Sequence, residues 1–137
     1  MFLLICWVGS AAHAARPHIV HIVADDLGWK DVGFNGCTDI RTPNLDALVA
    51  GGAKFTQFYV QPMCTPTRAA LMTGCYPYRY VMADMSKVKI PCDNGPYRDG
   101  KASLLEGGTR VCALANWPGQ IKPQVVDGMI HAVDLDK

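Results

Sequence analysis

The sequence predicts an α/β fold in which helices flank a parallel or mixed sheet, and three observations favour it. Residues 18–24, HIVHIVA, form a short run rich in β-branched side chains that suits a buried parallel strand. Thr42 and Pro43 follow as a helix start, and residues 54–60, KFTQFYV, have the composition of a second strand. The order strand, helix, strand is typical of a parallel α/β unit.

Two helices are expected because a Thr-Pro pair is a good N-cap followed by a residue suited to the first turn. The first should run from Thr42 until Gly51-Gly52 stops it. The second should begin at Thr65-Pro66 and end at Gly74. Residues 81–100 lack periodicity and are expected to form a loop.

A third strand is predicted from Arg110 to Trp117, before a Pro118-Gly119 turn. No element is predicted for the tail, residues 125–137.

The length of the chain limits it to one hydrophobic core. The chain has 137 residues, of which 50% are hydrophobic and 18% charged, so a single globular domain is expected. The formal net charge of +1 gives no electrostatic reason to expect nucleic acid as a partner. Any anion site must be local.

The first 14 residues resemble a secretory signal. An apolar run from Phe2 to Val8 is followed by small residues, although the usual positive charge at the start is missing. The alternative is a buried first strand or helix. No later run has the ~20 apolar residues that span a bilayer. We therefore expect residues 15–137 to be secreted or exported, to a periplasmic, extracellular or lysosomal compartment, without a transmembrane segment.

Removal of the signal would leave five cysteines, at positions 37, 64, 75, 92 and 112. Disulfides are common outside the cytosol, and an odd count leaves at least one thiol without a partner in the chain. One cysteine is thus open to another role. The pairing of the other four is not fixed by the sequence.

Two oxygen-rich pairs are candidate metal ligands. Asp25 and Asp26 follow the first predicted strand, and Asp93 and Asn94 precede a glycine in the irregular segment. Adjacent carboxylates repel each other unless a cation lies nearby, and hard divalent ions prefer oxygen ligands. Taken singly, each pair is more commonly a turn or a helix cap. Ligands of α/β sheets gather at strand carboxyl ends, which predicts that Asp25, Asp26 and Cys64 converge.

Cys64 and Arg68 flank the start of the second helix. Unpaired N–H groups and the helix dipole favour a negative charge there, and Arg68 can reach back toward an oxyanion. From the residues alone, Cys64 is either a nucleophile or half of a disulfide. His18 and His21 are expected to pack within the first strand, so no Cys-His-Asn arrangement can be argued.

Several motifs resemble one known family in their order along the chain. The segment CTPTR, residues 64–68, with LMTG after it, is similar to the signature C-x-P-[ST]-R of type I sulfatases. VADDLGW resembles the first metal loop of that family, DNGPYRDGK the second, and KASLLEGGTRV the E-G-G-x-R segment. The resemblance covers residues 17–80 and about 91–135.

The resemblance implies an arylsulfatase-like sulfuric ester hydrolase. Cys64 would be converted to formylglycine by a formylglycine-generating enzyme, and its hydrate would attack the sulfur of a sulfate ester. By the same resemblance, Asp25, Asp26, Asp93 and Asn94 would hold calcium, or magnesium instead, against the modified Cys64. Arg68 would orient the hydrate, and Lys101 would bind the sulfate. The implied fold is a fragment of the alkaline-phosphatase-like sulfatase fold.

The sequence also departs from the family. Sulfatases place a long central segment with proton-transferring histidines where this chain has residues 75–92, and they add a C-terminal subdomain. We therefore expect residues 15–137 to form an incomplete N-terminal catalytic domain with a compressed junction and little turnover. The alternatives are a non-catalytic protein that binds calcium or sulfated ligands, and an incomplete gene product. Related phosphoesterases are disfavoured because they usually have Ser or Thr in place of Cys64. The sulfate ester itself is not predicted.

Overall fold

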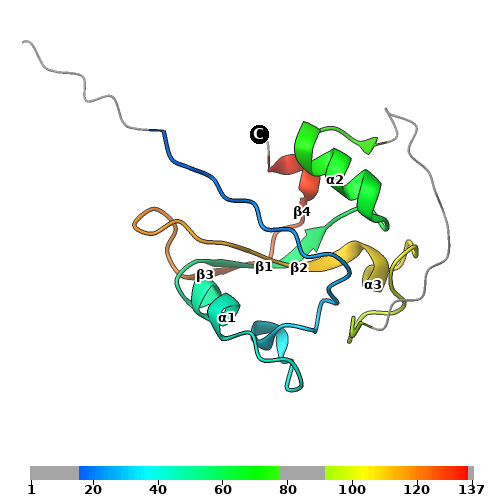
Figure 1. Ribbon diagram of the computed structural model, residues 1–137, viewed down its shortest axis with the longest axis horizontal. Helices are drawn as coiled ribbons and strands as arrows, with labels where there is room; N and C mark the ends of the chain where they lie inside the picture. Colours follow the sequence, from blue (N-terminus) through cyan, green and yellow to red (C-terminus); the bar gives the residue numbers. More distant parts are fainter. Residues whose placement is uncertain (1–15, 78–91, 136–137) are drawn as a thin grey trace, which may run out of the picture.

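A computed structural model describes residues 16–77 and 92–135 (Figure 1). The signal-like residues 1–14, and most of the junction near residues 75–92, lie outside this range. The described helices and strands occur in the order η1 (Gly33–Asn35), α1 (Pro43–Ala50), β1 (Ala53–Tyr59), α2 (Cys64–Thr73), α3 (Glu106–Thr109), β2 (Arg110–Ala115), β3 (Gln124–Val126), β4 (Ile130–His131) and η3 (Ala132–Asp134).

The sheet is mixed, and β1 is its central strand. On one side β1 pairs antiparallel with β2, with Ala53 opposite Ala115. On the other side it pairs in parallel with β3 and then with β4, where Phe58 faces Ile130. The α/β class with a mixed sheet and flanking helices is confirmed. Figure 1 shows α1 and η1 below the strands, and α2 with η3 above them.

The predicted strand at residues 18–24 is wrong. These residues form no strand, and four of their apolar side chains are more than half exposed: Ile19, Val20, Ile22 and Val23. Both hydrogen-bonding edges of β1 are already occupied, by β2 and by β3 with β4, so β1 offers the segment no place to pair. His18 and His21 are exposed as well, which corrects the prediction that they pack in a strand.

The other predicted elements are confirmed, with shifted ends. Helix α1 begins at Pro43 with Thr42 as its N-cap and stops at Gly51. Helix α2 begins at Cys64, one residue before the expected Thr-Pro start, because extended Met63 is its N-cap. Strand β2 starts at Arg110 as expected but ends at Ala115, two residues early. The short elements η1, α3, β3, β4 and η3 were not predicted, because each has only two to four residues.

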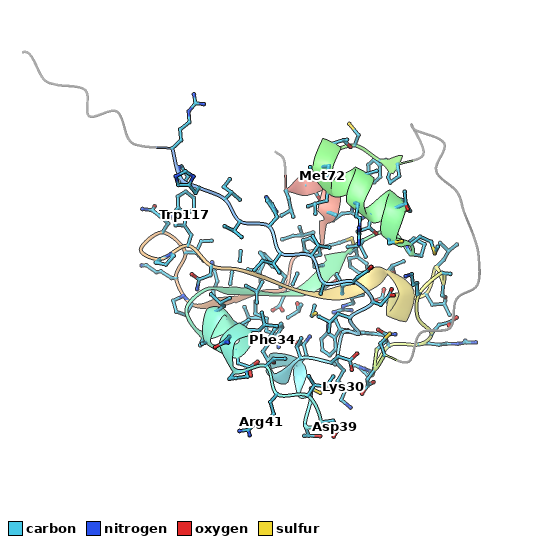
Figure 2. The ribbon with its side chains drawn as sticks, in the orientation of Figure 1. Lys30, Phe34, Asp39, Arg41, Met72 and Trp117 are labelled. Carbon is cyan, nitrogen blue, oxygen red and sulfur yellow. The ribbon has the colours of Figure 1, made fainter. Side chains whose placement is uncertain are left out.

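The core lies where α2 and η3 meet the end of β1. Its buried side chains are those of Phe58, Ala70, Ala132 and Val133. Other apolar residues pack around them only partly buried, namely Phe55, Val60, Val111, Ala113 and Ile130. The outer side of α2 is exposed, and Met72 points away from the chain there (Figure 2). This packing fixes α2, and with it Cys64, against the central strand.

Candidate functional site

Cys64 is the first residue of α2, and its position is set by hydrogen bonds on both sides of the helix start. The hydroxyl of Thr67 donates to the carbonyl oxygens of Gln61 and Met63, at 2.9 and 2.7 Å. The N–H of Ala102 donates to the carbonyl of Pro62 at 2.8 Å. These contacts place the loop that carries Lys101 beside the chain that enters α2.

The loop around Lys101 depends on unusual backbone conformations and on glycines. Asp99 and Ala102 both have φ near 72°, in the left-handed region that non-glycine residues rarely adopt. A side chain on Gly107 would collide with the carbonyl oxygen of Asp99, and one on Gly108 with that of Ser103. The two glycines of the E-G-G segment therefore let this loop pack directly on α3.

The acidic pair meets two of the predicted basic residues. Arg68 lies one turn into α2, and its guanidinium is 3.3 Å from a carboxylate oxygen of Asp25. The ammonium of Lys101 contacts Asp26, whose φ of 55° is also left-handed. The hydrogen bond to Asp26 raises the pKa of Lys101; partial desolvation opposes this rise, and the negative charges of Asp26 and Asp25 add to it. The acidic pair therefore lies beside α2 and the Lys101 loop, although no strand carries it.

The second candidate metal loop lies against the first. The N–H of Trp29 donates to the side-chain oxygen of Asn94 at 3.3 Å, and the N–H of Lys30 to the carbonyl of Asp93 at 2.9 Å. The carboxylate of Asp93 accepts from the N–H of Gly95, which lowers the pKa of Asp93, and the nearby ammonium of Lys30, 3.4 Å away, lowers it further. Figure 2 shows where Lys30 lies in the molecule.

Asp31 joins the two loops and was missed in the sequence. One of its carboxylate oxygens accepts from the N–H of Gly28 at 3.0 Å, and both accept from the N–H of Asp93 at 3.2 Å. The sequence does contain a signal for this role, because Asp31 is the third carboxylate within seven residues. A side chain on Gly28 would strike the carbonyl oxygen of Asp93, so this glycine allows the loops to touch.

The side-chain donors fit a hard divalent ion by their chemistry, since they are carboxylate and amide oxygens. The acidic pair already attracts a cationic group, the ammonium of Lys101. Each of the three predicted carboxylates pairs with a basic side chain in this structure, however. Across residues 16–77 and 92–135, no three His, Cys, Asp or Glu side chains are arranged as a metal site. A metal would have to displace these ion pairs.

The described cysteines give no support for a disulfide at the site. Cys37, Cys64, Cys75 and Cys112 are free thiols in the part of the chain that the structure describes. Burial raises the pKa of Cys112 to about 11, so this thiol is protonated at neutral pH.

No described helix is long and apolar enough to cross a membrane.

A cysteine at a helix start, two basic side chains and two acidic loops lie together beside the α/β sheet. The sequence profile of the sulfatase family matches residues 17–93. This chain therefore belongs to the sulfatase family, whose members are sulfuric ester hydrolases.

Two relatives that are themselves sulfatases agree with this assignment. The chain is 46% identical to human steryl-sulfatase over 91 residues, which is 66% of this chain and 16% of that protein. It is 48% identical to human arylsulfatase A over 94 residues, 68% of this chain and 18% of that protein. A solved structure, described as the crystal structure of Ps i-CgsB, is 61% identical over 42% of this chain and 13% of its own, with a TM-score of 0.41. The chain thus spans less than a fifth of the length of these relatives.

Proposed function

We propose that this chain carries the nucleophile and the anion-binding groups of a sulfuric ester hydrolase, with Cys64 as the residue converted to formylglycine. The observation that carries the proposal is the grouping of Cys64, Arg68 and Lys101 at the start of α2. When present, the formylglycine would supply the oxygen nucleophile for the sulfur of the ester. Arg68 would hold the formylglycine side chain and stabilise the developing negative charge, and Lys101 would bind a sulfate oxygen.

Calcium is the cation we propose, with magnesium as the alternative. Asp25, Asp26, Asp93 and Asn94 would hold it, together with the modified residue 64. The cation would act as a Lewis acid that lowers the cost of negative charge at the reacting group. Because Arg68 and Lys101 now contact the acidic pair, we propose that they exchange these carboxylates for the substrate when the cation binds.

A second candidate is a non-catalytic protein that binds calcium or a sulfated ligand, and the positions of the histidines favour it. His18 and His21 are exposed, and His131 contacts Gln61 and Val133. No histidine in the described residues hydrogen-bonds to Cys64, Arg68 or Lys101. A missing general acid typically costs a hydrolase about 10²–10⁴-fold in rate, so we expect slow turnover.

The proposal also names two partners and a location. A formylglycine-generating enzyme would act on Cys64 during maturation, and a sulfate ester would be the substrate. The signal-like residues 1–14 favour a secreted or exported product.

The first experiment is co-expression with a formylglycine-generating enzyme, followed by mass spectrometry of the peptide that contains Cys64. We expect an aldehyde at this position in the wild type and none in Cys64→Ala. An unmodified Cys64 under conditions that modify a control sulfatase would refute the proposed nucleophile.

Aryl sulfate hydrolysis and ligand binding then separate the two candidates. Slow release that needs Cys64 and calcium supports the hydrolase. Calcium-dependent sulfate binding without release supports the binding protein. Robust release that disappears in Cys64→Ala would overturn our expectation of slow turnover.

A further inference from the structure

Three side chains from three separate segments stack beside the two acidic loops. The guanidinium carbon of Arg110, at the start of β2, lies 4.4 Å from the ring centroid of Tyr97. The ring of Tyr97 meets that of Trp29 edge to face, with centroids 5.0 Å apart and planes at 82°. A guanidinium near the face of an aromatic ring and two rings packed edge to face are both energetically favourable arrangements. We call these three residues the Arg110–Tyr97–Trp29 stack.

The Arg110 end of the stack is fixed to the central strand. Its Nε donates to the carbonyl of Thr56 in β1 at 2.9 Å, and its Nη1 to the carboxylate of Glu106 at 3.1 Å. The hydroxyl of Tyr59, also in β1, donates to both oxygens of Glu106, at 3.0 and 3.1 Å. The Arg110 side chain is only 18% exposed. The guanidinium plane is therefore held by the sheet and by α3, which makes it a rigid base for the rings.

The other two members belong to the loops that carry the candidate metal ligands. Trp29 follows the first acidic loop, and its backbone N–H donates to the side-chain oxygen of Asn94. Tyr97 closes a turn on the second loop, where its N–H donates to the carbonyl of Asn94 at 2.9 Å. The stack thus runs from the start of β2 through the second loop to the first.

We propose that the Arg110–Tyr97–Trp29 stack is a positioning device that holds the two acidic loops at the spacing a divalent cation needs. This inference rests on the proposed function, because it assigns the stack to the metal site of that function. Arg110 and Tyr97 act through Asp93 and Asn94 and are positioning residues. Loss of such outer support typically weakens metal binding about 10–100-fold.

The test measures calcium affinity by titration calorimetry on the full chain. Tyr97→Leu removes the ring, Tyr97→Phe keeps it, and Arg110→Gln removes the cation at similar size. The matched control is Val133→Ala, which truncates a core side chain that is 1% exposed beside α2. It lowers the free energy of unfolding without touching the stack, so it separates loop positioning from general destabilisation.

A second readout does not depend on calcium. With Trp7→Phe and Trp117→Phe, Trp29 becomes the only tryptophan of the chain. The indole Nε1 of Trp29 is buried and has no hydrogen-bond partner among the described residues. Because its ring lies edge to face with that of Tyr97, its near-ultraviolet circular dichroism should report on this contact.

We expect Tyr97→Leu and Arg110→Gln to raise the calcium dissociation constant at least about tenfold and to reduce the Trp29 signal. Tyr97→Phe and Val133→Ala should stay within about twofold of wild type. Wild-type calcium affinity in Tyr97→Leu, or an equal loss in Val133→Ala, would overturn the proposal.

A wild type that binds no calcium would refute the metal part of the proposed function instead. The Trp29 signal then decides on the stack by itself. An unchanged signal in both Tyr97→Leu and Arg110→Gln overturns its role in joining the loops, and a reduced signal supports it.

Discussion

Replacing Lys101 with glutamine should strengthen calcium binding, although the family resemblance gives this residue a role only in binding sulfate. In the structure the ammonium of Lys101 contacts the carboxylate of Asp26, one of the proposed calcium ligands. A calcium ion and Lys101 therefore compete for the same oxygens. Lys101→Gln removes the competing charge and retains a polar side chain.

The size of the effect follows from the exposure of the pair. The side chain of Lys101 is 20% exposed and that of Asp26 is 34% exposed, so water screens the pair in part. Such pairs are worth about 1 kcal/mol at the upper end of the range for surface ion pairs. Releasing Asp26 from this competition corresponds to calcium binding about fivefold more tightly.

Titration calorimetry with calcium and with sulfate measures both sides of the exchange. Lys101→Gln should bind calcium more tightly and sulfate more weakly, since the same ammonium is proposed to hold the anion. Lys122→Gln is the control, because it removes an equal charge from the segment that precedes β3. Unchanged or weaker calcium binding in Lys101→Gln, or an equal gain in Lys122→Gln, would refute the competition.

Three further predictions concern packing and titration. Gly107→Ala should lower the free energy of unfolding by about 1–3 kcal/mol in a urea titration, because its Cβ would collide with the backbone of Asp99. Gly128→Ala, whose Cβ would meet nothing within 4 Å, should change it little. Cys112, with a pKa of about 11, has only about 0.1% thiolate at pH 8. Mass spectrometry should find it alkylated at least about a hundredfold more slowly than an ordinary exposed thiol until urea unfolds the chain. Burial lowers the pKa of His131 below its ordinary 6.5, so the unfolded chain binds the proton more readily. The free energy of unfolding should be highest above this pH and fall as the pH drops below it, and His131→Gln should flatten this dependence.

The elements that the sequence predicted correctly have strong local signals. Pro43 and Gly51 bound α1, and Gly74 follows α2 with φ of 60°, the left-handed conformation that glycine adopts without cost. Strand β1 contains three aromatic residues and the β-branched Thr56. Such signals act within a few residues, so a single sequence is enough to find them.

The first strand was mispredicted because pairing is not a local property. Residues 18–24 have the composition of a buried strand, but a strand forms only where a neighbour offers free N–H and C=O groups. The described neighbours of β1 fill both of its edges. The tail residues that occupy one edge, in β3 and β4, are too short to show a period.

The candidate site was predicted in part, for the same reason. Motif order grouped Cys64, Arg68, Lys101 and the acidic pair, and in the structure Arg68 contacts Asp25 and Lys101 contacts Asp26. It did not show that the basic residues pair with the proposed metal ligands. Nor did it reveal Tyr97 and Arg110 as supports, because their contacts join segments far apart in the chain.

These contacts change the account of what holds the acidic pair in place. A paired strand would fix Asp25 and Asp26 through backbone hydrogen bonds, but the segment before them is exposed and forms no strand. Their side chains are instead held by Arg68 and Lys101, and the loop that follows them by Asp31 and the stack. A cation that displaced Arg68 and Lys101 would have to replace the contacts that now order the pair. Metal binding and loop order are therefore coupled in this chain, and the stack is the part of the support that a bound cation would leave intact.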